Sequence, residues 1–340
     1  MKCLTKASFK CPSTTIIVKN GKMPNSAFMK ENVMLIDPCG RPVKSIRISV
    51  TQRCNLNCFY CHREGEDIEH HEEMTPEEIR CIVEVATSFS INKVKLTGGE
   101  PLVRKDIAEI VQKVRSIQGV EEISMTTNGV LLAENAQKLK DAGLARVNVS
   151  LGTLNPEKFK QITCVDAFEK VILGIQTAAM VGLKPVKVNM VLLRGLNDGE
   201  VSDMIRFTAK NDLILQIIEL ETLSKIDETG TYKKYHAEMD DIKAYLERMA
   251  EKVVIREMHH RRKYFLKGGG EVEVVNPMHN TEFCRYCNRI RVTSDGKLKP
   301  CLLRNDNLVD FVDPLREGAS KRTLKALFVE AVNRRKPFFA

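Results

Sequence analysis

Short apolar strands alternate with amphipathic helices along most of this chain, and that alternation limits its possible folds more than any other feature. The predicted strands, each followed by a helical pattern, span residues 45–50, 94–97, 123–126, 146–151, 186–192 and 213–220. Six strand–helix units in one run predict a parallel sheet with right-handed crossovers. We therefore expect an α/β protein, an open or partial barrel whose chemistry lies at the carboxyl ends of its strands.

The pattern divides the chain into three parts. Residues 1–33 show no hydrophobic periodicity and are predicted to be a poorly ordered extension. Residues 34–221 hold the six strand–helix units, and residues 222–340 are predicted to be a smaller module over the barrel mouth. The elements predicted in that module are one helix within 225–245, short strands near 253–256 and 271–275, and a last helix over 321–333.

Three cysteines directly follow the first predicted strand, in the run C-N-L-N-C-F-Y-C. Cys54, Cys58 and Cys61 supply three thiolates to one loop, where a closed site needs four ligands. This count predicts an iron–sulfur cluster in which one iron has no protein ligand. An iron left open in this way can bind a substrate or cofactor, which predicts that the chain is an enzyme. The alternative is a structural zinc knuckle, for which only His62 is nearby as a fourth ligand.

A second group of cysteines repeats the count of three near the carboxyl end. Its members are Cys284, Cys287 and Cys301. Arg289 and Arg291 alternate on a short predicted strand between them and so point to the same side. Two guanidiniums beside metal ligands predict an anion or a heterocycle docked there. The alternative is a zinc site that His279 completes.

Other motifs also follow predicted strands. Gly98-Gly99-Glu100-Pro101 is a turn whose glycines let the backbone approach a small ligand closely, although such a turn alone is a weak signal. Arg47 and Lys187 lie within predicted strands. Either they are solvated or salt-bridged, or they bind an anionic ligand, and the cost of burying an unpaired cation favours the ligand.

Composition and net charge limit the classes of binding partner that the chain can have. No apolar run reaches the roughly 20 residues of a membrane span, and no signal peptide is evident. Eleven cysteines in such a chain predict metal or redox chemistry in the cytoplasm rather than disulfides. Residues 1–33 supply +5 of the formal net charge of +9. Residues 34–340 therefore carry a net charge of only +4. This modest excess indicates a small anionic substrate, and it does not indicate nucleic acid or a membrane as a partner.

The motifs together resemble one enzyme family. Cys54, Cys58 and Cys61, with Tyr60 before the last, and the Gly-Gly-Glu-Pro turn resemble the radical S-adenosylmethionine (SAM) superfamily. Over residues 35–340 the chain also resembles the GTP 3′,8-cyclases of molybdenum cofactor biosynthesis, specifically the archaeal type. Two segments carry this resemblance: D-P-C-G-R-P-V-K-S-I-R-I-S-V-T-Q-R-C and F-C-R-Y-C-N-R-I-R-V-T-S-D-G-K-L-K-P-C-L. The fold implied is a partial (β/α)6 radical SAM barrel with a smaller C-terminal cluster-binding module.

The resemblance implies a lyase with two [4Fe–4S] clusters. SAM binds the N-terminal cluster and yields a 5′-deoxyadenosyl radical, which abstracts H3′ of GTP. The product is (8S)-3′,8-cyclo-7,8-dihydroguanosine 5′-triphosphate, the first intermediate on the way to molybdopterin. Implied partners are an electron donor (a reductase, ferredoxin or flavodoxin) and a downstream cyclic pyranopterin monophosphate synthase, and a homodimer is compatible with the family.

The resemblance also implies roles for individual residues. The implied metal ligands are Cys54, Cys58, Cys61, Cys284, Cys287 and Cys301. The implied SAM contacts are Tyr60, Gly99 and Ser150. The implied GTP contacts are Arg47, Lys95, Thr126, Lys187, Arg289, Ile290 and Arg291, of which Arg289 and Arg291 are also implied to be catalytic.

The chain departs from the family pattern at three places. Gly152 and Glu221 replace an acid and a methionine near SAM, and the chain ends in Lys336-Pro337-Phe338-Phe339-Ala340 instead of a glycine pair. Two rival functions use other subsets of the motifs: a two-cluster radical SAM enzyme acting on a peptide or another metabolite, and a zinc- or nucleic-acid-binding protein.

Overall fold

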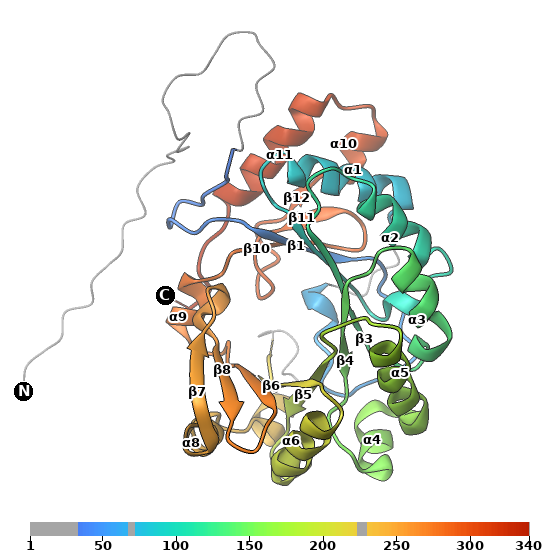
Figure 1. The fold of residues 1–340 in the computed structure, drawn as a ribbon. Helices are drawn as coiled ribbons and strands as arrows, with labels where there is room; N and C mark the ends of the chain where they lie inside the picture. The colour runs from blue at the N-terminus through green and yellow to red at the C-terminus, as the bar shows by residue number, and fades with distance from the viewer. Residues whose placement is uncertain (1–32, 67–71, 223–229, 340) are drawn as a thin grey trace, which may run out of the picture.

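The computed structural model describes residues 33–66, 72–222 and 230–339 (Figure 1). Its central feature is one sheet with the strand order β12-β11-β10-β1-β2-β3-β4-β5-β6-β9-β8-β7. The strands β1 to β6 are consecutive and mutually parallel. They span Ser45–Ser49, Lys93–Thr97, Glu122–Thr127, Arg146–Ser150, Lys187–Leu192 and Ile214–Glu219. The predicted α/β partial barrel is thereby confirmed.

Helices connect these parallel strands and lie along the outer side of the curved sheet (Figure 1). They are α1 (Pro76–Thr87), α2 (Ile107–Arg115), α3 (Leu132–Asp141), α4 (Pro156–Thr163), α5 (Phe168–Met180) and α6 (Val201–Lys210). Each turns an apolar face toward the sheet; in α2 that face includes Ile110, Val111 and Val114, all without exposed surface. The hydrophobic core therefore lies between the sheet and the helices, and the inner side of the sheet is left for polar residues.

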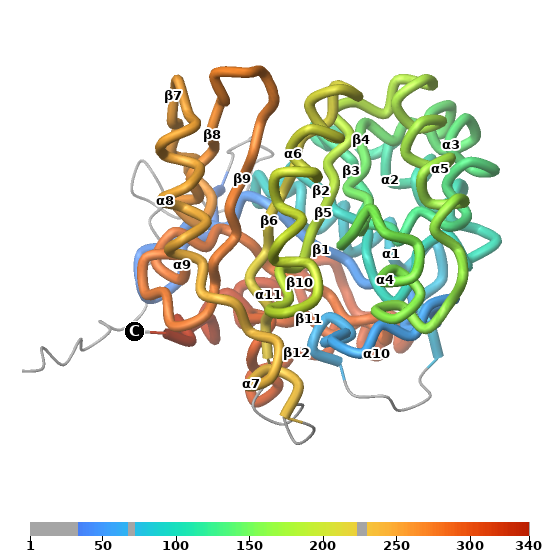
Figure 2. Tube along the Cα trace, turned by 90° about the horizontal axis from the view of Figure 1, so that it is seen from below, coloured from blue at the N-terminus to red at the C-terminus, as the bar shows by residue number. Residues whose placement is uncertain are grey.

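Residues 230–339 extend both edges of the parallel sheet. On one side β9 (Glu271–Val275) runs parallel to β6 and is followed by β8 (Arg262–Leu266) and β7 (Ala250–Ile255), side by side in Figure 2. On the other side β10 (Arg289–Val292) runs parallel to β1 and continues into β11 (Lys297–Lys299) and β12 (Val309–Asp310). These residues thus contribute directly to the sheet as well as to its mouth.

The strand β8 is not predicted by the sequence pattern, because R-K-Y-F-L begins with two charged residues and buries only Tyr264 and Leu266. The remaining helices are α7 (Thr231–Tyr235), α8 (Asp240–Met249), α9 (Thr281–Arg285), α10 (Val312–Arg316) and α11 (Lys321–Asn333). The last helix has the predicted bounds. The division at residue 221 stays a prediction.

The predicted extension over residues 1–33 lies, except for Val33, outside the described residues. None of the helices in the described part of the chain is long and apolar enough to cross a membrane.

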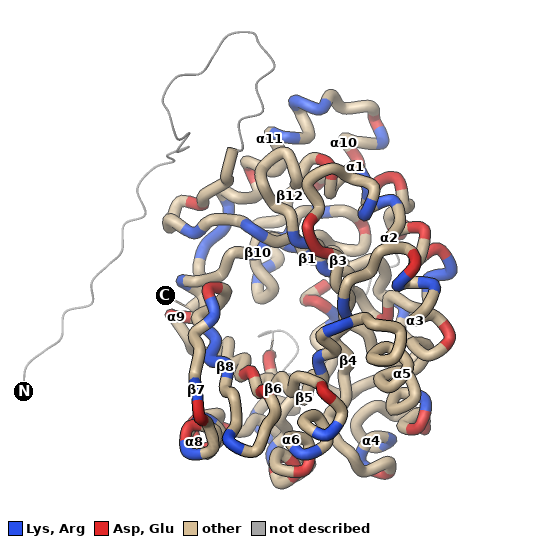
Figure 3. The backbone as a smooth tube through the Cα atoms, viewed as in Figure 1, with Lys and Arg blue, Asp and Glu red and all other residues tan. Residues whose placement is uncertain are grey.

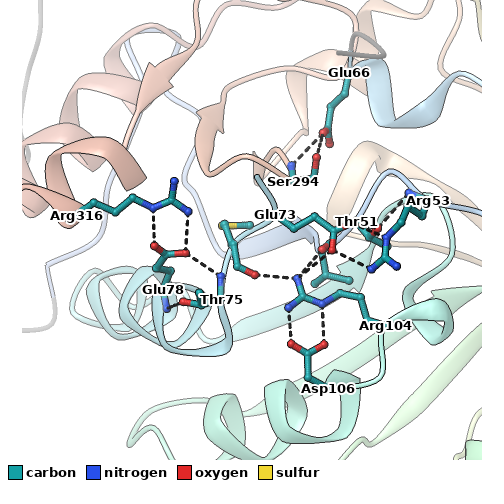
Figure 4. Close-up of polar contacts among 12 residues, drawn as sticks. Thr51, Arg53, Glu66, Glu73, Thr75, Glu78, Arg104, Asp106, Ser294 and Arg316 are labelled. Carbon is teal, nitrogen blue, oxygen red and sulfur yellow. Dashed lines mark hydrogen bonds and ion pairs between the residues drawn. The ribbon is translucent and has the colours of Figure 1, made fainter. Parts of the chain in front are cut away.

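The start of α1 ties the N-terminal and C-terminal parts together (Figure 4). Thr75 and Glu78 form a capping box, in which each side chain accepts a hydrogen bond from the other residue's backbone N–H. The Glu78 carboxylate also accepts from Arg316 at the end of α10, 2.7 Å from its Nε. One carboxylate therefore fixes both the helix start and the position of α10.

Candidate active site

A cavity of about 930 Å³ on the inner side of the sheet reaches both cysteine groups. All six predicted cysteine ligands line it: Cys54, Cys58, Cys61, Cys284, Cys287 and Cys301. The other predicted site residues that line it are Arg47, Tyr60, Lys95, Gly99, Thr126, Ser150, Lys187, Arg289 and Arg291. Ile290 is the exception: its side chain is fully buried in the hydrophobic core, because neighbouring residues of β10 point to opposite faces.

The loop of the first cysteine group is held where it leaves β1 (Figure 4). The Arg53 guanidinium donates from Nε and Nη2, each 3.0 Å from an oxygen of Glu73. The hydroxyl of Thr51 donates to the same carboxylate and accepts from the Arg53 backbone N–H. Glu73 precedes α1, so the loop is anchored to a helix that is itself fixed in the core.

The Gly-Gly-Glu-Pro turn packs against the start of the same loop. The Gly99 N–H donates to the Thr51 carbonyl oxygen at 2.7 Å, and a Cβ added at Gly99 would lie 2.3 Å from the carbonyl oxygen of Arg53. A side chain there would displace the cysteine loop. Glu100 is buried and accepts from Thr127 Oγ1 at 2.7 Å and from the Asn128 N–H at 2.6 Å, while burial raises its pKa to about 7.

The cysteines of the first group fit a cluster ligated by three thiolates. They lie close enough for Cys61 and Cys54 to raise the pKa of Cys58, which burial already raises, to about 12. The Leu56 N–H and the Asn128 Nδ2 approach Cys54 Sγ at 3.4 and 3.8 Å, as donors to a cluster sulfur do.

The second group is also compact. Both Cys287 and Cys284 raise the pKa of Cys301, after burial as the main cause. The pKa of Cys287 is instead lowered: burial opposes the thiolate, but Arg335, Arg41 and Arg289 together outweigh it. The arginines around Cys287 therefore favour its thiolate more than in an ordinary cysteine.

Cations face the cavity side by side across three strands. The register pairs Arg47 on β1 with Arg291 on β10 and with Lys95 on β2. Adjacent strands are about 4.8 Å apart, so the three side chains stand abreast on one face. Like charges placed this way repel one another. Figure 3 shows the wider pattern, with lysine and arginine recurring on the strands that border the central space.

Glu64 pairs with two of these cations, Arg47 and Arg291. It lies three residues after Cys61, and the left-handed backbone at Arg63 (φ 48°) and Glu64 (φ 54°) turns its carboxylate inward. Glu64 accepts from Arg47 Nη2 at 2.5 Å and from Arg291 Nη1 at 2.6 Å. Burial raises the pKa of this carboxyl, but the two arginines outweigh burial and lower the pKa to about 2.

The residues around Glu64 attach the first cysteine loop to the C-terminal strands. Arg291 holds Glu64, Lys299 Nζ donates to the Gly65 carbonyl oxygen at 3.0 Å, and Ser294 donates from its backbone N–H (2.9 Å) and its hydroxyl (2.7 Å) to Glu66 (Figure 4). Three consecutive residues after the first cysteine group thus contact β10, β11 and the turn between them, which fixes the two cysteine groups relative to each other.

A second carboxylate, Glu273, gathers three cations at the β6–β9 side of the cavity. Lys187 Nζ and Arg256 Nη1 both lie 2.5 Å from Glu273 Oε1, and Arg261 Nη1 lies 4.0 Å from Oε2. Gln216 donates to Oε2 at 2.9 Å. Burial lowers the pKa of Lys187 to about 8; Glu273 opposes this shift, and repulsion from Arg256 and Arg261 adds to it.

Sequence reasoning singled out neither Glu64 and Glu273 nor Arg256 and Arg261. One signal was available: in E-V-E-V-V the charged residues alternate with valines, which indicates a buried polar face. For Arg47 and Lys187, the salt-bridged alternative is what the structure contains. Their burial therefore does not by itself require a ligand.

Positive charge nevertheless exceeds negative charge in the cavity. Fifteen lysines and arginines line it against six glutamates. Arg289 pairs with no carboxylate among the described residues; its Nη2 lies 3.2 Å from Met258 Sδ. Lys95 donates to Asn148 Oδ1 at 3.0 Å, and burial together with the nearby arginines Arg146 and Arg47 lowers its pKa well below the usual range. Such a site favours a polyanion.

The three departures from the family pattern also converge here. Gly152, Glu221, Lys336 and Phe338 all line the cavity. A Cβ added at Gly152 would meet only Asn197 Nδ2, at 3.5 Å, so glycine is not sterically required there. The C-terminal segment brings a cation, Lys336, and an aromatic ring, Phe338, to the cavity.

Comparison with known proteins agrees with this geometry. The radical SAM superfamily model matches residues 48–208, and the Molybdenum Cofactor Synthesis C model matches residues 213–340. A probable GTP 3′,8-cyclase of Thermococcus kodakarensis is 50% identical over 309 residues, covering 90% of this chain and 100% of that protein. Another, of Methanothermobacter marburgensis, is 51% identical over 300 residues, covering 88% and 97%.

Solved structures show the same fold at low sequence identity. SuiB of Streptococcus suis bound to S-adenosylmethionine aligns with a TM-score of 0.58 at 16% identity, covering 76% of this chain and 60% of SuiB. The protein anSMEcpe with bound AdoMet aligns with a TM-score of 0.56 at 19% identity, covering 77% and 76%. The extent and identity of the sequence matches decide the family. The chain belongs to the radical SAM superfamily and, within it, to the family of the GTP 3′,8-cyclases.

Proposed function

We propose that the cavity binds GTP between two iron–sulfur clusters and joins C3′ of the ribose to C8 of the guanine. As a GTP 3′,8-cyclase, the chain is a radical SAM enzyme of molybdenum cofactor biosynthesis with two [4Fe–4S] clusters and SAM as cofactors. The observation that carries the residue-level proposal is that both three-cysteine groups open on one cavity with a large cationic excess.

We assign each ligand to a part of the cavity from the side chains that line that part. We assign Cys54, Cys58 and Cys61 to the cluster that binds SAM, with Tyr60, Gly99 and Ser150 beside SAM. We assign Cys284, Cys287 and Cys301 to the cluster beside the guanine. The proposed GTP contacts are Arg47, Lys95, Thr126, Lys187, Arg289 and Arg291, to which the structure adds Arg256 and Arg261 as candidates.

The chain's own residues bind and orient the substrate. Lys187, Arg256 and Arg261 form a cluster of three cations suited to a polyphosphate, since one carboxylate neutralises only part of their charge. Arg289, with no carboxylate partner in the described ranges, lies next to the second cysteine group and suits the guanine or a developing negative charge. When bound, the first cluster and SAM supply the one-electron chemistry that removes a hydrogen atom from the ribose.

The curved sheet surrounds the cavity, and this enclosure suits radical chemistry, because a radical intermediate must be kept away from solvent and from other groups that it could attack. The link between Glu64 and Arg291 fixes the distance between the two cysteine groups, and with it the geometry between hydrogen abstraction and ring closure. A peptide substrate is not favoured, since the curated relatives that match nearly the whole chain are named as GTP 3′,8-cyclases.

The partners are part of the proposal. An electron must reach the first cluster from a reductase, ferredoxin or flavodoxin, and the cyclised nucleotide must pass to a cyclic pyranopterin monophosphate synthase. We propose a cytoplasmic enzyme and allow for a homodimer.

Iron analysis and turnover under anaerobic conditions test the proposal. About eight irons per chain are expected for two four-iron clusters. With GTP, SAM and a reductant, the protein should form 3′,8-cyclised GTP and 5′-deoxyadenosine together. SAM cleavage that is indifferent to GTP would refute the assignment of the substrate, and zinc with little iron would refute the clusters.

A further inference from the structure

Two arginines far apart in the sequence hold the backbone of the second cysteine group. Arg41 Nη1 donates to the carbonyl oxygen of Cys284 at 2.8 Å, and Arg335 Nη2 donates to the carbonyl oxygen of Cys287 at 2.7 Å. The carbonyls of both cysteines in the C-x-x-C segment at the end of α9 therefore accept from guanidiniums. One guanidinium comes from before β1 and the other from just after α11.

One buried aspartate holds both arginines. Asp37 Oδ2 accepts from Arg41 Nε at 2.7 Å and lies 3.3 Å from Arg335 Nη1. Its other oxygen accepts from the backbone N–H groups of Cys39 and Arg41, at 3.0 and 2.9 Å. The side chains of Asp37 and Arg335 are 0% exposed and that of Arg41 is 7% exposed.

Stability alone does not explain such an arrangement. Burying a charged network is costly, and apolar residues of similar volume often stabilise a fold as well or better. Arg335 even leaves its Nε buried without a partner among the described residues. What the arginines provide, and apolar residues cannot, is a set of donors aimed at two carbonyls and one positive charge in excess of Asp37.

We propose that Asp37, Arg41 and Arg335 form a carbonyl clamp that positions the cysteines of the second cluster. The clamp fixes Cys284 and Cys287 through their own carbonyls and keeps a net positive charge beside the thiolates. Residues that orient the ligands of a metal centre in this way commonly change metal affinity 10- to 100-fold when altered. The inference rests on the proposed assignment of a cluster to these cysteines.

The clamp also directs the end of the chain into the cavity. Arg335 is followed directly by Lys336 and, two residues later, by Phe338, and both line the cavity. The ring of Phe339 packs against that of His279, 5.0 Å between centroids, just before α9. The residue that holds Cys287 thus also anchors the segment that reaches the cavity.

Two cysteine-deleted proteins allow each cluster to be measured alone. In the full chain carrying Cys54→Ala, Cys58→Ala and Cys61→Ala, only the second cluster remains after anaerobic reconstitution. There we expect Arg335→Met and Arg41→Met each to speed iron release to a chelator about tenfold or more. Each leaves the other arginine paired with Asp37, so no buried charge is left alone. Arg335→Lys keeps the positive charge but lacks the planar guanidinium with its several donors. Its rate of iron release should therefore lie between those of the unaltered protein and Arg335→Met.

Two controls distinguish positioning from general damage. Arg334→Met removes an exposed arginine next door and should release iron at the unaltered rate. In the protein carrying Cys284→Ala, Cys287→Ala and Cys301→Ala, Arg335→Met should leave the first cluster unchanged. Unaltered release from the second cluster, or equal acceleration in both proteins, would overturn the clamp. If the second group takes up no iron at all, the cluster assignment in the proposed function falls as well.

Discussion

Arg47 and Arg291 stand directly opposite each other across the β1–β10 pairing, and both donate to the carboxylate of Glu64. Two guanidiniums at the same level of adjacent strands would repel each other without a shared anion. Because Glu64 belongs to the loop of the first cysteine group and Arg291 to the strand beside the second, this contact joins the two halves of the cavity.

Replacing Glu64 should therefore destabilise the cofactor-free protein. Glu64→Gln leaves two largely buried arginines, with side chains 19% and 16% exposed, without their carboxylate. Removing one partner of a buried pair costs about 3–5 kcal/mol. Urea unfolding at pH 7 measures the loss. Glu77→Gln is the matched control, since Glu77 forms exposed pairs with Arg80 and Lys113, and its loss should leave the free energy of unfolding nearly unchanged. Equal losses in the two variants would contradict the shared-anion role of Glu64.

Lys187 and Arg289 should be needed for GTP and not for the clusters. We expect Lys187→Ala and Arg289→Ala to abolish cyclisation while keeping the iron content of the unaltered protein. A hydrogen bond to a charged group contributes about 1.5–3 kcal/mol, so GTP affinity should fall about 10- to 150-fold.

Equilibrium binding of GTP to the reconstituted proteins measures that change. Lys184→Ala serves as control, because Lys184 lines the cavity but is more than half exposed and pairs with Asp212. If Lys187→Ala binds and turns over GTP normally, the assignment of Lys187 to the phosphates is wrong.

Glu273 predicts a pH dependence of stability. Lys187, Arg261 and Arg256 outweigh burial and lower the pKa of Glu273 to about 2, from an ordinary value of 4.5. Because its folded-state pKa is lowered, the stability it contributes is fully present above pH 4.5 and is lost as the pH falls toward 2. Urea unfolding between pH 6 and pH 3 should show this loss in the cofactor-free protein.

The Glu273→Gln variant should be less stable at pH 6 and should lose less stability on acidification, with Glu64 accounting for part of the remaining slope. Glu271→Gln, on the same strand but partly exposed beside Lys263, should keep the slope of the unaltered protein. An unchanged acid slope in Glu273→Gln would contradict the pairing described for this carboxylate.

Gly99 should be required for the first cluster. A Cβ there would lie 2.3 Å from the Arg53 carbonyl oxygen, so Gly99→Ala must shift the start of the cysteine loop. We expect the variant to retain about four irons per chain, those of the second cluster. Gly199→Ala has open space around its new Cβ and should retain both clusters. Full iron content in Gly99→Ala would mean that the loop accommodates the side chain.

Local patterns in the sequence were sufficient to predict the parallel strands, the last helix and both cysteine groups, because periodicity and ligand spacing are short-range properties. The pairing of charges was not predictable in this way. Nothing in the sequence near Glu64 indicates that it meets Arg291, which is 227 residues away. Likewise, the contacts of Arg335 with Asp37 and Cys287 exist only once α11 has packed and β10 has joined β1.

The strand β10 shows what alternation along a strand can predict and where it departs from family resemblance. Its alternation predicted that Arg289 and Arg291 face the same way, and both line the cavity. The same alternation places the side chain of Ile290 in the core, and Ile290 does not line the cavity. The assignment of Ile290 to the substrate site rests on family resemblance alone.

Transfer of a label from GTP to SAM tests the central claim most directly. The reconstituted protein would be incubated anaerobically with SAM, a reductant and GTP carrying deuterium at C3′, and the 5′-deoxyadenosine formed would be examined by mass spectrometry. We predict that one deuterium appears in 5′-deoxyadenosine and that the 3′,8-cyclised nucleotide forms with it. Unlabelled 5′-deoxyadenosine formed alongside unreacted GTP would contradict the account.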